Sequence, residues 1–130
     1  MKDIIDAILA LIPITAYYVE VPEKPTYPYA LVWSTSGLPT AEQSLVGGDD
    51  LSDLVGVTTV HTTPRNAVKV AGEVVRPALA GAHPVVAGRL VTLSLFDSRQ
   101  VEVDEKVTLT DTNRHPAFAV DIYRLVSVPA

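Results

Sequence analysis

Residues 62–81, which read TTPRNAVKVAGEVVRPALAG, are the stretch that decides the fold. Thr62 or Thr63 can supply an N-cap oxygen, and Pro64 suits the first helical position, where its missing N–H costs nothing. Gly81 is typical of the left-handed residue that ends a helix. Pro77 removes a hydrogen bond inside this helix, so we expect a kink or an early end there.

Small apolar residues follow helical spacing through this stretch and predict a single apolar stripe. The stripe consists of Ala67, Val68, Ala71, Val74, Val75, Ala78 and Leu79. Arg65, Lys69, Glu73 and Arg76 fall mainly on the other side. Because the stripe is made of Ala and Val, a flat partner such as a β-sheet must approach it closely. We therefore expect Val74 and Val75 to pack on a sheet, and to do so together with Leu31, Leu93 and Ile122.

The rest of the chain supplies that sheet and one more helix. The spacing of Ile4, Ile5, Ile8 and Leu9 predicts a short helix that ends at Pro13. Runs of β-branched and aromatic residues predict strands over residues 17–21, 29–34, 51–62, 89–96, 107–109 and 118–128. A charged stretch, residues 97–106, is typical of a protruding hairpin. The order predicts a single α+β domain over residues 1–130, a mostly antiparallel β-sheet with two α-helices packed on one face.

Composition limits the classes of function. With 130 residues and 48% hydrophobic content, the chain can bury a sizeable core. A net charge of −5 argues against a protein that neutralises many DNA phosphates. Without cysteine there are no disulfides, thiolate metal sites or cysteine nucleophiles. Asp3 and Asp6 interrupt the pattern of a signal peptide, and the apolar run is too short to span a bilayer. We therefore expect the first helix to dock on the core.

Patterns typical of catalysis are weak throughout. His61, His83 and His115 do not follow a metal-ligand spacing, and two of them precede proline, as turn residues do. The pairs Asp49–Asp50 and Asp104–Glu105 are adjacent in extended chain, so their carboxylates point in different directions. We expect no catalytic residue, no metal and no cofactor.

Surface features are more informative. Residues 37–50 contain Leu45 and Val46 between glycines and acidic residues, and an apolar tip on a long loop is typical of a binding surface. We expect this loop to become ordered against a partner. The alternative, in which Leu45 and Val46 pack on their own sheet, stays open. The candidate subunit or tube interface consists of Leu45, Val46, Asp49, Asp50, Arg99, Glu102, Asp104 and Arg114.

The order of short motifs resembles a known family. The motifs are Tyr27–Pro28–Tyr29 before a strand that ends at Trp33, Thr62–Thr63–Pro64–Arg65 before the helix, Gly88–Arg89 at the start of a strand, and Val120–Asp121–Ile122–Tyr123–Arg124 in the last strand. This layout is similar to that of the tail terminator (tail completion) proteins of long-tailed siphophages, particularly those that infect actinobacteria.

The resemblance implies a structural virion protein without catalysis, cofactor or membrane contact. Such a protein forms a homohexameric ring that caps the tail tube, ends its polymerisation and presents the surface for the head–tail connector. It is assembled in the host cytoplasm and lies in the neck of the virion, and genome DNA passes through its lumen without specific binding. Two alternatives stay open: another neck component, such as a stopper or head–tail joining protein, and a small α+β hydrolase that uses Asp97 and a histidine.

Overall fold

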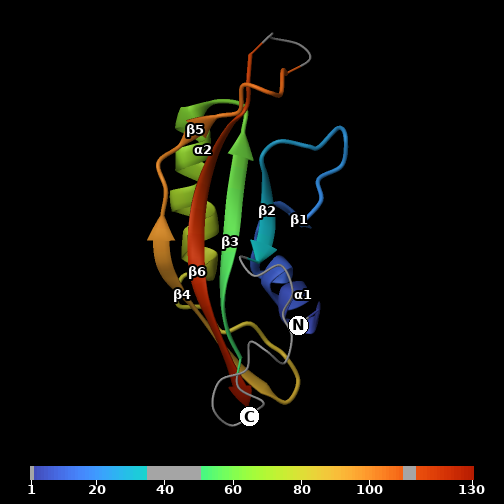
Figure 1. The fold of residues 1–130 in the computed structure, drawn as a ribbon, viewed down its shortest axis with the longest axis vertical. Helices are drawn as coiled ribbons and strands as arrows, with labels where there is room; N and C mark the ends of the chain where they lie inside the picture. Colours follow the sequence, from blue (N-terminus) through green and yellow to red (C-terminus); the bar gives the residue numbers. More distant parts are fainter. Residues whose placement is uncertain (1, 35–50, 110–113) are drawn as a thin grey trace.

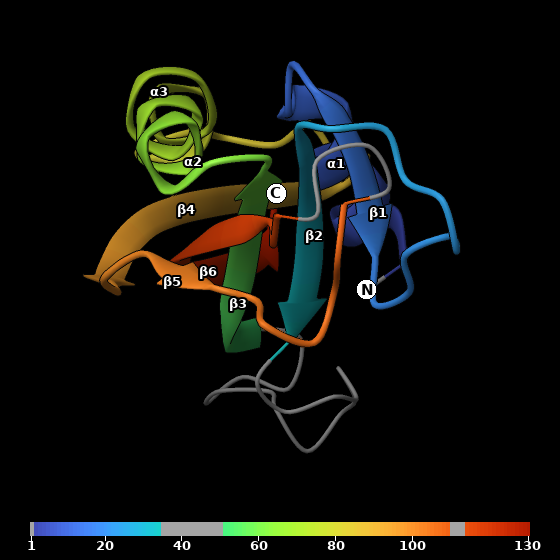
Figure 2. The same cartoon turned by 90° about the horizontal axis from the view of Figure 1, so that it is seen from above.

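One mixed sheet of six strands carries two helices on one of its faces (Figures 1 and 2). The computed structural model describes residues 2–34, 51–109 and 114–130. The strands are β1 (Thr15–Tyr18), β2 (Tyr29–Ser34), β3 (Leu51–His61), β4 (Arg89–Ser98), β5 (Glu102–Val103) and β6 (Ala117–Pro129). The helical elements are α1 (Lys2–Leu11) and a long helix composed of α2 (Pro64–Val70), a π-helical turn (Ala71–Val75) and α3 (Arg76–Leu79). The predicted α+β fold is confirmed.

The sheet has the strand order β1-β2-β3-β6-β4, and β5 pairs with β6 beyond the end of β4. Only the short β1 pairs in parallel among the described strands, with β2. The pairs β2–β3, β3–β6, β4–β6 and β5–β6 are antiparallel, as the sequence predicted. The two longest strands, β3 and β6, lie side by side along their length and form the centre of the sheet (Figure 1).

The long helix begins and ends where its sequence predicts. Thr63 is the N-cap, its side chain accepts the N–H of Asn66 at 3.2 Å, and Pro64 follows at the first helical position. Gly81 has φ +76° just past the last turn. Pro77 does not end the helix early. Its turn is preceded by the π-helical turn, in which the Arg76 N–H bonds to the Ala71 carbonyl. A wider turn next to proline is one way in which a helix tolerates the missing N–H.

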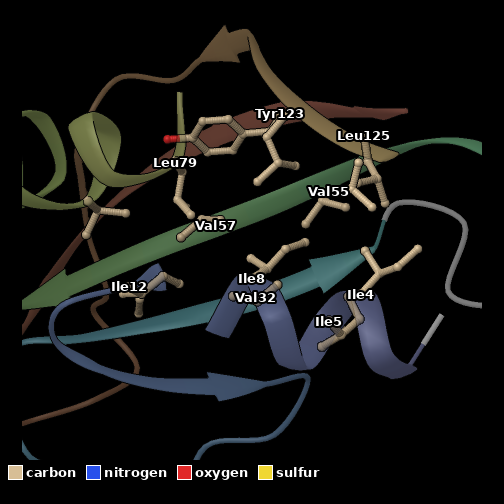
Figure 3. Close-up of a cluster of buried hydrophobic side chains, with 14 residues drawn as sticks. Ile4, Ile5, Ile8, Ile12, Val32, Val55, Val57, Leu79, Tyr123 and Leu125 are labelled. Carbon is tan, nitrogen blue, oxygen red and sulfur yellow. The ribbon is translucent and has the colours of Figure 1, made fainter. Parts of the chain in front are cut away.

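The core lies between this helix, α1 and the sheet (Figure 3). Ile4, Ile5 and Ile8 of α1, and Ile12 just after it, are buried in the core cluster together with strand residues. Val75 and Leu93 are both only 1% exposed and lie in the same cluster, as predicted. The remaining large members are Val32, Val55, Val57, Leu79, Val91, Tyr123 and Leu125. The short helix at the start of the chain therefore docks on the core.

Two residues of the predicted core lie on the other face of the sheet, so that part of the prediction is wrong. Ala30 and Val32 face the helices, which places Leu31 between them on the opposite face. Tyr123 and Leu125 likewise face the helices, which places Ile122 opposite. Val74 is half-buried rather than buried. Val68, predicted in the apolar stripe, points outward and is 50% exposed.

Besides shifts of one or two residues at the ends of β3, β4 and β6, three parts of the chain differ from the prediction. The first strand is Thr15–Tyr18 and stops before Val19, which has φ +68°. Residues 97–106, expected to form a protruding hairpin, do not form one by themselves: the Arg99 N–H bonds to the Val120 carbonyl, β5 pairs with β6, and the Asp104 N–H bonds to the Pro116 carbonyl. Residues 107–109 do not form a strand. The loop of residues 37–50 lies outside the described residues.

Candidate interaction surface

The sheet face that points away from the helices, called here the open face, carries an aromatic platform. Trp33 of β2, Gly56 of β3 and Ile122 of β6 stand in one cross-strand row. The indole of Trp33 lies against Gly56, and its Nε1–H donates to Thr58 Oγ1 at 3.0 Å. This row of the open face is therefore apolar and aromatic.

A hollow of about 240 Å³ opens on this face, where β2 begins and β3 ends. We call it the aromatic hollow. Its floor consists of side chains from β2, β3 and β6, namely Tyr29, Leu31, Thr58, Val60 and Phe118. Its walls are formed by Tyr27, which precedes β2, and by Asp104, Val107 and Pro116, which lie between β5 and β6. Tyr29 stacks at tilted or edge-on angles with Tyr27 and Tyr17, with ring centroids 5.6 and 5.7 Å apart. Such geometry is favourable for aromatic pairs.

A hairpin made of residues 104–109 and 114–116 holds the second wall of the hollow. The Asp104 N–H donates to the Pro116 carbonyl at 2.8 Å, and the Leu109 N–H donates to the Arg114 carbonyl at 2.6 Å. His115 Nδ1 lies 2.5 Å from the Val107 carbonyl. These backbone contacts place a carboxylate beside tyrosine rings. Burial, followed by the neighbouring Tyr27 and Asp104, raises the pKa of Tyr29.

Asp104 is the one acidic group in the lining of this hollow. Its Oδ1 accepts the Lys106 N–H at 3.1 Å, as in an Asx turn. That contact orients the carboxylate and leaves its second oxygen able to accept from a partner. An apolar cavity with a single carboxylate at its wall favours a group that has an apolar stem and a cationic head.

A second polar cluster lies on the helix side of the sheet and is structural. Arg76 Nε and Nη2 donate to the two carboxylate oxygens of Asp121, each at 3.0 Å, and Ser98 Oγ donates to Asp121 Oδ1 at 2.6 Å. Asp121 is 4% exposed, so this carboxylate is buried although it is charged. This ion pair ties the first residue of α3 to the central strand β6.

The outer strand β4 is exposed in part. Leu90, Leu95 and Phe96 are 62%, 40% and 53% exposed, and a β-bulge separates Leu95 from Asp97. The Arg124 guanidinium lies 4.9 Å from the centre of the Phe96 ring. Near the middle of β4, Gly81 and Ala82 exchange backbone hydrogen bonds with Leu93 and cover that part of the edge.

Four of the predicted interface residues are placed by the structure. Glu102 lies exposed in β5, and Asp104 follows two residues later in the wall of the aromatic hollow. Arg114 lies exposed in the hairpin, where its carbonyl accepts the Leu109 N–H. Arg99 is exposed at the junction of β4 and β5. The other four predicted residues, Leu45, Val46, Asp49 and Asp50, lie outside the described residues.

The three histidines are not assembled into a site. His61 Nδ1 accepts the Thr62 N–H at 2.7 Å, and burial lowers the pKa of His61. His83 Nδ1 lies 3.2 Å from the Val91 carbonyl. The Asp97 carboxylate accepts the Ser98 N–H at 2.9 Å. Within residues 2–34, 51–109 and 114–130, there is no group of three His, Cys, Asp or Glu side chains that could hold a metal ion. The same ranges contain no helix with the length and hydrophobicity that crossing a membrane requires.

Sequence reasoning missed the residues that form the aromatic hollow. Tyr27, Tyr29 and Phe118 come from two separate parts of the chain and meet only because β2, β3 and β6 are neighbours. A signal was present in Tyr27–Pro28–Tyr29, since two aromatic side chains close together at a strand start can form a contiguous apolar patch.

Comparison with known proteins identifies similarity at the level of the fold. Neither a protein-family model nor a curated protein matches the sequence. Among solved structures, a chain in the virion of a native gene transfer agent (GTA) particle has a similar fold, with a TM-score of 0.52. The match covers 93% of this chain and 84% of that chain, at 16% sequence identity. The likeness therefore extends over nearly the whole α+β domain.

Proposed function

We propose that this protein is a structural component of a phage-like particle, and specifically a tail terminator whose ring caps the tail tube. The observation that carries the proposal is the fold shared with a virion chain over 93% of this sequence. The order of motifs in the sequence supports the finer assignment, because it is similar to that of tail terminators.

The surfaces are consistent with an assembly role. The open face presents ordered aromatic groups and a hollow, and the β4 edge exposes Leu90, Leu95 and Phe96. Exposed apolar groups of this kind are typical of protein contacts. In the proposed assembly, the partners are further copies of the chain in a hexameric ring, the tail tube protein and the head–tail connector.

Net charge fits a ring with DNA in its lumen. Each chain carries a formal −5, so six copies carry about −30. Like charge disfavours adhesion of the genome to the ring as it passes, in accordance with a role that requires no specific DNA binding.

Electron microscopy tests the proposal directly. Tail tubes of the same particle are polymerised with and without the purified protein, and gold-labelled antibodies locate the protein. We expect a ring at one tube end only, and tubes that stop growing once capped. Label at the head–connector joint without effect on tube length would instead favour a stopper or head–tail joining protein. Absence of label from the particle would exclude a virion role.

A further inference from the structure

The aromatic hollow has the size of one protein side chain. Its volume of about 240 Å³ falls below the ~300–1,000 Å³ of usual small-molecule sites. Two tyrosines, Tyr27 and Tyr29, line it together with the Asp104 carboxylate, which lies close enough to raise the pKa of Tyr29. Tyrosine faces attract cations, and a guanidinium can stack on the rings while it binds a carboxylate through two N–H groups. The chemistry of the hollow therefore fits an arginine side chain.

The chain itself presents such a side chain on the outward side of its long helix. Arg65, Val68 and Lys69, called here the α2 outer face, lie on neighbouring turns. All three are exposed, with Val68 at 50%, and they line a shallow surface hollow together with Asn66 and Glu73. The two surfaces are complementary: Val68 lies between two cations on the α2 outer face, and Val107, 40% exposed, lies beside the carboxylate of Asp104 at the aromatic hollow.

These two surfaces lie on opposite sides of the domain. The floor of the aromatic hollow consists of open-face residues such as Leu31 and Phe118. The long helix covers the opposite face of the sheet (Figure 2). Its buried residues Ala67 and Ala71 face the sheet, so the α2 outer face points away from the sheet. Two complementary patches on opposite sides cannot meet within one chain, and between copies they produce a head-to-tail contact, which closes into a ring when the rotation permits.

We propose that a second copy of this chain docks its α2 outer face on the aromatic hollow, with Arg65 between the tyrosine rings and Asp104 and with Lys69 at the rim. The inference rests on the proposed ring and names its subunit contact. Opposite charge on the two surfaces makes the contact specific. The contact of Val68 in one copy with Val107 in the other excludes water from the ion pair of Arg65 and Asp104.

Charge reversal with complementation tests this contact. Asp104→Arg makes both surfaces cationic, and Arg65→Glu with Lys69→Glu makes both anionic. We expect each variant alone to lose ring formation in native mass spectrometry and on tail tubes, with an unchanged melting temperature. Mixed in equal amounts, the two variants again present opposite charges at every contact, so we expect alternating rings with a 1:1 composition. Asp97→Arg is the control, since Asp97 is an exposed aspartate that, like the half-buried Asp104, accepts a nearby backbone N–H.

The outcomes separate this contact from the proposed function. Rings that form equally well from either variant alone, or mixtures that stay monomeric, would overturn the contact. Tube capping that survives both sets of reversals would retain the terminator function and remove this interface. If the wild-type protein forms rings, the reversals abolish and restore them as expected, and yet no tube is ever capped, the contact would be retained and the terminator function removed. A wild-type chain that is monomeric both in solution and on the tube would overturn both.

Discussion

The indole of Trp33 occupies the space that a side chain at Gly56 would need. A β-carbon at Gly56 would lie 2.1 Å from Trp33 Cε2 and 2.2 Å from Cζ2, well inside van der Waals contact. The two residues are direct partners across β2 and β3. Glycine is thus required here for close approach of the ring and not for its backbone conformation, and the ring in turn covers a glycine that would otherwise weaken the strand.

Gly56→Ala should displace this ring. We expect the free energy of unfolding to fall by about 1–3 kcal/mol, the usual cost of overpacking, as measured by chemical denaturation. Tryptophan fluorescence should shift, because Trp33 is the only tryptophan. Gly72→Ala is the control, since its β-carbon would have 3.9 Å to the nearest atom and alanine favours the helix. Equal effects of the two substitutions would contradict the close approach.

Removal of Arg76 should leave a buried carboxylate without its cation. Asp121 is 4% exposed and Arg76 37%, so we expect Arg76→Met to cost about 2–3 kcal/mol, below the range for fully buried pairs. The double variant Arg76→Met with Asp121→Leu should recover most of that loss, because no charge then remains buried. Arg65→Met, an exposed site, serves as the control. A double variant as unstable as the single one would argue against an isolated ion pair.

The Tyr123 hydroxyl is buried and has no hydrogen-bond partner among the described residues. Burial, followed by the charge of Asp121, raises the pKa of Tyr123 above its ordinary value of 10.0. A raised pKa means that the folded state favours the protonated phenol. The resulting contribution to the free energy of unfolding is complete below pH 10 and is lost as the pH rises further. We expect Tyr123→Phe to be neutral or to stabilise by about 1 kcal/mol at pH 7.

Denaturation as a function of pH checks this expectation. Above pH 10, the difference in stability between Tyr123→Phe and wild type should grow in favour of phenylalanine. Tyr18→Phe, at a half-buried tyrosine of β1, is the comparison. A large loss of stability for Tyr123→Phe at pH 7 would mean that the hydroxyl makes a favourable hydrogen bond after all.

Val19 has a backbone conformation that β-branched residues rarely adopt. Its φ is +68°, and the Glu20 N–H bonds to the Tyr18 carbonyl at 2.7 Å, which closes a γ-turn. The side chain is 58% exposed, so little packing is lost if it is removed. We expect Val19→Gly to stabilise by about 0.5–1 kcal/mol, because glycine relieves the strain at some cost in unfolded-state entropy.

Val21→Gly is the matched control in the same segment, since Val21 does not have a positive φ. Val21→Gly should lose stability, because the entropic cost of glycine and the loss of a half-buried side chain apply there without any relief of strain. Thermal denaturation of both variants makes the comparison, and a loss of stability for Val19→Gly would contradict the strain.

Local sequence determined the helices and most strands of this protein. Thr63, Pro64 and Gly81 define the ends of the long helix through hydrogen bonds and dihedral preferences that act within a few residues. Periodicity likewise placed β3, β4 and β6 close to their observed limits. The α+β class followed from these elements because each apolar stripe requires a partner.

Tertiary structure decided which face each strand buries. Leu31 stands within an apolar run, so alternation carried no information about its direction, and Asp121 is charged yet points inward because Arg76 reaches it from the helix. Pro77 is tolerated because the π-helical turn is held against the sheet by buried Ala71 and Val75. The aromatic hollow arises from the pairing of distant strands. Such contacts depend on partners far apart in the chain, and short-range patterns do not encode them.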